Sequence, residues 1–165
     1  MLKELVPFGT TIRKVLEHRG KAEDWELLSN IAAILMDKED QHGSESLRTP
    51  ERYLAAIDAM IRQVNNGGWD QFFTDSSGAF AYDLVPALEA VGSSEFKATA
   101  HKAVELFGQI PSLDEDARFD QVERLTEDWE LQPWDSCDNE VFGCTENVET
   151  LAIDYAIAHL QEFID

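Results

Sequence analysis

The densest group of chemically active side chains is a run of carboxylates between residues 114 and 130. Five of them recur at intervals of three or four residues, namely Asp116, Asp120, Glu123, Glu127 and Glu130. Because an α-helix repeats every 3.6 residues, this spacing predicts one narrow acidic face. Val122, Leu125 and Trp129 would then point nearly opposite, toward a core.

Such a row of carboxylates can present charge in the manner of a polynucleotide. Successive acids advance by about 4.5–6 Å along the helix axis, from a rise of about 1.5 Å per residue. Phosphates of one DNA strand advance by about 3.4 Å per nucleotide along the duplex axis and follow a longer slanted path. The two charge densities are therefore comparable.

The predicted face contains no base to offset its acids. Two like charges about 6 Å apart repel by roughly 0.7 kcal/mol in water, so four neighbouring pairs cost on the order of 2–3 kcal/mol before screening by salt. Most charged runs are simply solvated helix surfaces, which usually carry Lys or Arg at the i+4 positions. The uncompensated repulsion favours a cationic partner instead. Further acids that would widen the patch are Asp128, Asp135, Asp138 and Glu140.

Other groupings of reactive residues point less clearly to a site. Asp135, Cys137, Asn139 and Glu146 fall at positions 1, 3, 5 and 12 of a calcium loop. Position 6 of such a loop should be Gly but is Glu140 here, and a thiol is a poor calcium ligand. Four histidines stand apart in the sequence without a catalytic motif around them. We therefore predict neither an enzyme nor a cofactor or metal site.

The charge of the whole chain also restricts the possible partners. The 165 residues include 33 acids and 13 bases, for a net charge of −20. Residues 114–165 hold 16 of the acids and two of the bases. Nucleic acid and anionic lipid would be repelled, so we expect no direct binding to nucleic acid or membrane.

Two further features predict a cytoplasmic protein. Residues 1–20 lack the uninterrupted apolar run of a secretory signal, and no stretch approaches the roughly 18 apolar residues of a membrane span. Cys137 and Cys144 are too few for a disulfide framework and have no histidine close in sequence. Free thiols in a reducing compartment are the expectation.

The elements that must position these residues are helices, since apolar residues recur mainly at helical spacing. The expected helices cover residues 22–37, 49–64, 69–73, 80–91, 94–107, 114–132 and 146–164, with a loop over 133–145. The first would bury Trp25, Leu28, Ala32 and Leu35, and the second would begin with Thr49 as its N-cap. The fold is predicted to be all-α, a single compact helical domain of about six to eight helices over residues 1–165.

The stretch NNGGWDQFFTDSSG, residues 65–78, contains small residues of the kind that bind phosphate. A phosphate loop needs a preceding strand, but here a helix precedes it. No Lys or Arg lies between Arg62 and Lys97 to balance a phosphate. The stretch is therefore predicted to break one helix and start another, with Trp69, Phe72 and Phe73 in the core.

The same motif carries a resemblance. A helix ending in NGG, then WDQFF, then SSG, then alanines and a leucine before Gly92 resembles the signature of the nineteen-kilodalton DNA mimic protein family of bacteria. The match runs from about Tyr53 to Phe107. The resemblance implies an all-α fold and an acidic protein that occupies the DNA-binding surface of a transcription factor.

Together these observations predict a DNA mimic that blocks the basic DNA-binding surface of a transcription factor or another DNA-binding protein. Helix-turn-helix regulators are often two-fold symmetric, so we expect a homodimer, as the resemblance also suggests. An immunity or inhibitor protein that neutralises a basic toxin, such as a nuclease, is the alternative. It would use the same acids against a different cationic surface.

Overall fold

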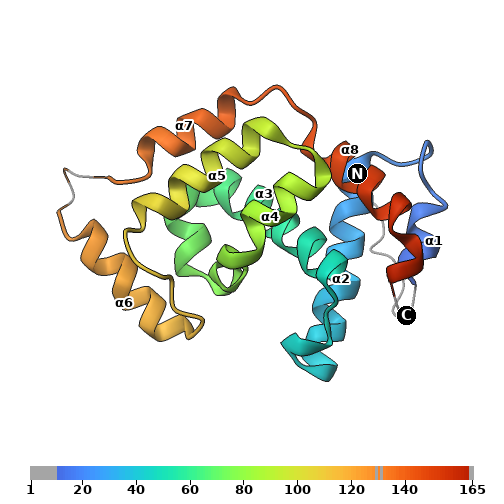
Figure 1. Cartoon of the computed structure of the whole chain (residues 1–165), viewed down its shortest axis with the longest axis horizontal. Coiled ribbons are helices and arrows are strands. Elements are labelled where there is room, and N and C mark those ends of the chain that lie inside the picture. The colour runs from blue at the N-terminus through green and yellow to red at the C-terminus, as the bar shows by residue number, and fades with distance from the viewer. Residues whose placement is uncertain (1–10, 129, 131, 164–165) are drawn as a thin grey trace.

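The computed structural model describes residues 11–128, 130 and 132–163. Over that range the chain forms eight α-helices and short 3-10 turns, without a β-strand (Figure 1). The helices are α1 (Ile12–Leu16), α2 (Asp24–His42), α3 (Thr49–Thr74), α4 (Ala81–Val91), α5 (Ser94–Leu106), α6 (Glu115–Thr126), α7 (Asp135–Gly143) and α8 (Val148–Ala158). The prediction of a compact all-α domain of six to eight helices is confirmed.

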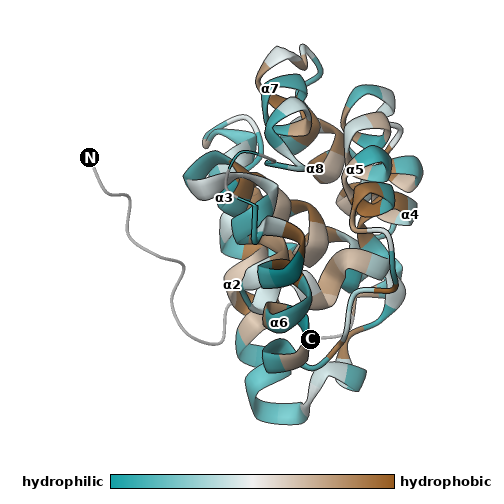
Figure 2. Cartoon of the chain, turned by 90° about the vertical axis from the view of Figure 1, so that its left-hand side faces the viewer, coloured by the Kyte–Doolittle hydropathy of each residue, from teal (hydrophilic) through white to brown (hydrophobic). Residues whose placement is uncertain are grey.

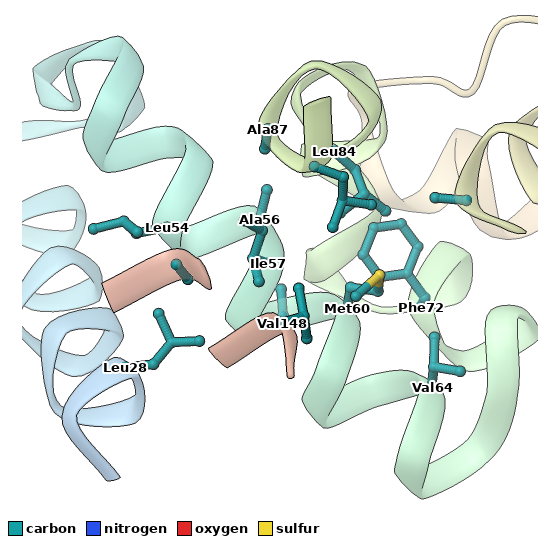
Figure 3. Close-up of a cluster of buried hydrophobic side chains, with 14 of the residues drawn as sticks. Leu28, Leu54, Ala56, Ile57, Met60, Val64, Phe72, Leu84, Ala87 and Val148 are labelled. Atoms are coloured by element: carbon teal, nitrogen blue, oxygen red, sulfur yellow. The ribbon is translucent and has the colours of Figure 1, made fainter. Parts of the chain in front are cut away.

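Helix α3 lies at the centre of the fold and packs against α2, α4, α6, α7 and α8. Its buried residues include five consecutive positions, Ala56 to Met60, so the middle of the helix is covered on all sides, as expected of a central helix. Figure 3 shows part of the resulting core, where side chains of α3 meet those of α2, α4 and α8. The labelled α3 residues there are Leu54, Ala56, Ile57, Met60, Val64 and Phe72, and those of its neighbours are Leu28, Leu84, Ala87 and Val148.

The predicted break within residues 65–78 is confirmed. Gly67 and Gly68 have non-helical backbone angles that kink α3, and Gly68 takes a positive φ of 76°. Beyond the kink, Trp69, Phe72 and Phe73 are fully buried. The kink at Gly67 and Gly68 therefore directs the three aromatic side chains that follow it into the core.

Two expectations near the N-terminal end of the described range are wrong. Trp25 is 57% exposed, because the buried side of α2 is centred on Leu28 and Ile31 and Trp25 lies at its edge. Thr49 is the first helical residue of α3, so Arg48 takes the N-cap position. The carboxylate of Glu51 caps the helix by accepting a hydrogen bond of 2.8 Å from the Arg48 N–H.

The C-terminal third also differs from expectation. Residues 135–143 form helix α7, where a loop was expected, and the last α-helix runs from Val148 to Ala158. The pattern Trp134, Cys137 and Val141 explains α7, since all three are buried on one side. Gly143 and the polar residues in this segment obscured that periodicity.

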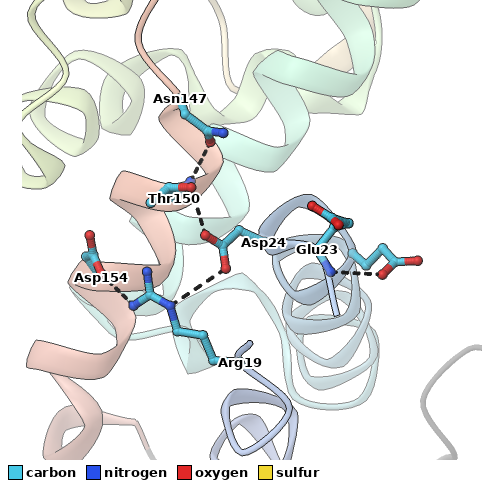
Figure 4. A network of polar contacts seen from close by, with 7 residues as sticks. Arg19, Glu23, Asp24, Asn147, Thr150 and Asp154 are labelled. Carbon is cyan, nitrogen blue, oxygen red and sulfur yellow. Dashed lines mark hydrogen bonds and ion pairs between the residues drawn. The ribbon is translucent and has the colours of Figure 1, made fainter. Parts of the chain in front are cut away.

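A polar network joins the segment before α2 to α8 (Figure 4). Arg19 pairs with Asp24 and Asp154, and the Thr150 hydroxyl donates to Asp24 over 2.7 Å. Asp24 and Asp154 thus share one base, Arg19. No helix in the described part of the chain is long and apolar enough to cross a membrane.

Candidate functional site

Helix α6 lies at the left-hand end of the molecule in Figure 1. Asp116, Asp120 and Glu123 are exposed, whereas Arg118 and Val122 on the opposite side are buried. Glu127 is the C-cap residue and keeps helical angles, φ −56° and ψ −37°. These four carboxylates, Asp116, Asp120, Glu123 and Glu127, form what we call the α6 acidic face.

The α6 acidic face is not neutralised by its surroundings. None of its four carboxylates makes an ion pair with another residue in the described ranges. Arg124 borders the face and lines the same shallow hollow as Asp120, Glu123 and Glu127. The face is therefore flanked by one exposed base, which the sequence pattern had placed outside it, and still carries an excess of negative charge.

The acidic row is shorter than the sequence predicts. Helix α6 ends at Thr126, and Asp128 and Glu130 lie in the turn that follows. The Asp128 carboxylate accepts a hydrogen bond of 3.1 Å from the Glu130 N–H, a local bond that competes with helix continuation. Asp128 and Glu130 remain exposed but do not continue the face. Trp129, expected to point into the core, lies outside the described residues.

The acids of α7 belong to a different part of the surface, because α7 packs on α5 and α3. Asp135 is exposed in its first turn. Asp138 is half-buried, accepts a hydrogen bond of 2.8 Å from the Trp69 N–H, and has its pKa raised chiefly by burial. Glu140 pairs with Lys102. Asp138 and Glu140 are therefore structural or compensated groups, contrary to their expected place in an uncompensated patch.

Arg118 fixes α6 to the rest of the molecule. Its side chain is fully buried, and its guanidinium donates to four backbone carbonyls, those of Phe73 (2.7 Å), Asp75 (2.8 Å), Ser112 (2.7 Å) and Leu113 (3.4 Å). Phe73 and Asp75 lie at the C-terminal end of α3, where the helix dipole favours a positive charge. Burial lowers the pKa of Arg118, which has no carboxylate hydrogen-bonded to it in the described structure.

Two glycines of the NNGGWDQFFTDSSG stretch make room for side chains of the C-terminal third. A Cβ at Gly78 would lie 2.2 Å from Arg118 Nε and 2.5 Å from the Phe73 oxygen. A Cβ at Gly68 would lie 2.5 Å from Asp138 Oδ2. The motif therefore packs against Arg118 of α6 and Asp138 of α7. Its sequence did not reveal this role.

Potential metal ligands are scattered over the described residues. No group of three or more His, Cys, Asp and Glu in that range could hold a metal ion. Asp135, Cys137 and Asn139 lie on helix α7, so the positions of a calcium loop are not arranged around a common centre. Cys137 and Cys144 are free, and burial raises the pKa of both thiols, which disfavours a reactive thiolate.

A known protein family matches most of this chain. The profile of DMP19-like proteins matches residues 45–159, from the 3-10 turn that precedes α3 to the end of α8. The chain belongs to the DMP19-like protein family. The match includes both the kinked α3 and the acidic α6 of this DMP19-like chain, and it confirms the resemblance expected from the NGG–aromatic–SSG motif. No curated protein and no solved structure matches the chain significantly.

Proposed function

We propose that this DMP19-like protein is a DNA mimic that binds the basic DNA-binding surface of a transcription factor and blocks its access to DNA. The observation that carries the proposal is the α6 acidic face, four exposed carboxylates on one side of a helix without ion pairs among the described residues. Membership of the DMP19-like family supports the same role. The proposed role is binding, without catalysis.

The dimensions of the face suit this role. Asp116 to Glu127 spans about 16 Å along the helix axis at about 1.5 Å per residue. About five phosphates of one DNA strand cover the same axial distance at about 3.4 Å each. Lys and Arg side chains that contact successive phosphates can therefore reach successive carboxylates of the face.

The partner we propose is a helix-turn-helix regulator. In such proteins the bases that contact phosphates surround a recognition helix, and two subunits are related by two-fold symmetry. A homodimer of the mimic would present two acidic faces to the two subunits. Charge complementarity would make the association fast and would weaken it as the salt concentration rises.

Affinity capture from the native cell tests the proposal. Immobilised wild-type protein is expected to retain a DNA-binding protein at low salt, and added duplex DNA should release it by competition. The α6 variant, with Asp116, Asp120, Glu123 and Glu127 changed to Lys, should not retain it. A gel shift then measures whether the wild-type protein displaces DNA from the purified partner.

A matched variant controls for total charge. Glu17, Glu45, Glu89 and Glu105 are exposed acids outside the face, and their change to Lys alters the net charge equally. This control should still capture the partner. If both variants lost capture equally, the effect of the α6 changes would be one of total charge and not of the α6 acidic face. Retention of a toxin in place of a DNA-binding protein would favour the immunity function.

A further inference from the structure

A hollow of about 430 Å³ lies beside α6, between α2, α3 and the 3-10 turn η2 (Ser76–Phe80). Figure 2 views the molecule from the end that carries α6. Leu35, Leu47 and Phe80 provide apolar lining, and Leu113 and Arg118 link the hollow to the N-terminal part of α6. We call this hollow the α2–α6 groove. It shares Arg118 with α6 and therefore borders the side of that helix opposite the α6 acidic face.

Two large apolar side chains of the α2–α6 groove are unusually accessible. Met36 is 52% exposed and Leu113 is 68% exposed, although both border a hollow that already has an apolar lining. Singly exposed apolar residues are common on protein surfaces, but two that line the same hollow are more typical of a contact surface. A partner that fills the groove would remove both from water.

The charged lining of the groove consists of four acids, Glu39, Asp40, Asp58 and Glu115, and two bases, Arg62 and Arg118. Glu39, Asp40 and Glu115 border it, and none of them forms an ion pair with another described residue. Asp58 lies deeper and is balanced by Arg62, at 3.1 Å between Nε and Oδ2. Arg52, whose charge interacts with that of Glu39, is bonded to Asp83 at 2.6 Å. The groove thus combines apolar walls with an excess of acids over bases, although the charge of Glu115 acts on the buried Arg118 and that of Glu39 on Arg52.

We propose that the α2–α6 groove binds an amphipathic, basic helical segment of a protein, with its apolar side chains in the groove and its Lys or Arg side chains against Glu39, Asp40 and Glu115. Resting on the proposed function, the inference assigns this segment to the same DNA-binding protein that the α6 acidic face engages. Charge complementarity across a solvated face mainly accelerates association and selects the partner. Most of the binding energy of an interface comes from a few side chains in desolvated pockets, and the groove is the place beside α6 where such a pocket can form.

A synthetic probe tests the groove without knowledge of the partner. The probe is a fluorescein-labelled amphipathic helical peptide of Leu and Lys, and the comparison peptide has the same composition in a scrambled order without an apolar side. Fluorescence anisotropy with the full chain should give at least about tenfold tighter binding of the amphipathic peptide. The combined Met36→Ser and Leu113→Ser changes should remove that difference, since both side chains are exposed and their loss should leave the fold intact.

A control variant and a direct measurement complete the test. Phe142 on α7 is 66% exposed and lies outside the groove lining, so Phe142→Ser should leave peptide binding unchanged. In the wild-type protein, the NMR methyl signals of Met36, Leu47 and Leu113 should shift when the amphipathic peptide is added. Equal binding of the two peptides, or shifts confined to other methyl groups, would overturn the groove assignment. The DNA-competition experiment on the α6 acidic face would still decide the proposed function separately.

Discussion

Arg118 shows how a single cation can support an anionic surface. It is one of two bases in residues 114–165, and its guanidinium is bonded to carbonyls inside the fold. Its charge therefore adds little to the exposed surface of α6. Arg118 and Val122 are the buried residues of this helix, so the orientation of the α6 acidic face depends strongly on Arg118.

We predict that Arg118→Met destabilises the protein by about 2–4 kcal/mol, because it leaves several buried carbonyls without a donor. In the Arg118→Met variant, the acceleration of amide exchange with solvent should be larger for the amides of α6 than for those of α3. Urea unfolding and hydrogen exchange measure the two effects. Arg124→Met is the matched control, since Arg124 is exposed on the same helix. Similar losses in both variants would exclude an anchoring role for Arg118.

Gly78 gives a second prediction at this scale. Gly78→Ala should destabilise the fold by about 1–3 kcal/mol, because the new Cβ would overlap Arg118 Nε and the Phe73 oxygen. Gly143→Ala is the control, since a Cβ at Gly143 meets nothing within 4 Å. It should be neutral or slightly stabilising at the end of α7. Thermal unfolding of the two variants provides the comparison, and an unchanged Tm for Gly78→Ala would contradict the close packing described here.

At the level of elements, two acids tie the start of α5 to the segment before α8. The carboxylate of Glu146 accepts hydrogen bonds from the Ser93 and Ser94 hydroxyls and from the N–H groups of Ser94 and Glu95. In return, Glu95 accepts from the N–H groups of Thr145 and Glu146. This exchange satisfies N–H groups that a helix start leaves free, so Glu146, considered above as a calcium ligand, acts as a helix cap.

We expect Glu146→Gln to lower stability at pH 7 by about 1–2 kcal/mol, the usual value of a helix cap. Desolvation would raise the pKa of Glu146, but the hydrogen bonds from Ser93, Ser94 and Glu95 outweigh it and lower the pKa to about 2. An acid with a lowered folded-state pKa stabilises the fold above its unfolded pKa of about 4.3. The advantage of the wild type should therefore shrink as pH falls from about 4.3 toward about 2.

Urea unfolding across this pH range measures the difference between the two proteins. Glu17→Gln serves as a control, because Glu17 is exposed and distant in sequence from the cap. A difference between wild type and Glu146→Gln that stays constant down to pH 2 would show that the carboxylate charge does not support the cap.

The elements also show what sequence patterns can and cannot predict. The kinked α3 was predictable because Gly67 and Gly68 interrupt a long apolar periodicity that Trp69 and Phe72 then resume. The end of α6 was not predictable from the sequence, because acids continue at helical spacing beyond Thr126. The hydrogen bond from the Glu130 N–H to the Asp128 carboxylate competes with continuation of the helix there. Spacing also predicted the α6 acidic face. It did not reveal the anchor Arg118, because a buried base and an exposed base look alike in a charge count.

At the scale of the whole molecule, charge is distributed unevenly between the two ends. At the α1 and α8 end, acids such as Asp24 and Asp154 are paired with Arg19 (Figure 4). At the α6 end, the acids of the face have no such partner among the described residues (Figure 1). An excess of negative charge concentrated at one end orients an approaching cationic protein before contact. The α2–α6 groove lies at that end.

This arrangement predicts a stability that depends on salt. Neutralising the α6 acidic face with Asp116→Asn, Asp120→Asn, Glu123→Gln and Glu127→Gln should raise Tm by about 2–4 °C at about 20 mM NaCl, because repulsion between neighbouring carboxylates is removed. At about 500 mM NaCl the gain should nearly vanish, since salt already screens exposed charges at these separations. Scanning calorimetry at both salt concentrations measures the change.

The same number of neutralised acids outside the face, Glu17, Glu45, Glu89 and Glu105, should give a smaller gain, because Glu89 and Glu105 already pair with Lys97 and His101. A loss of stability on neutralising the α6 acidic face at low salt would mean that these carboxylates support the fold. A gain would show that the fold does not require these four acids.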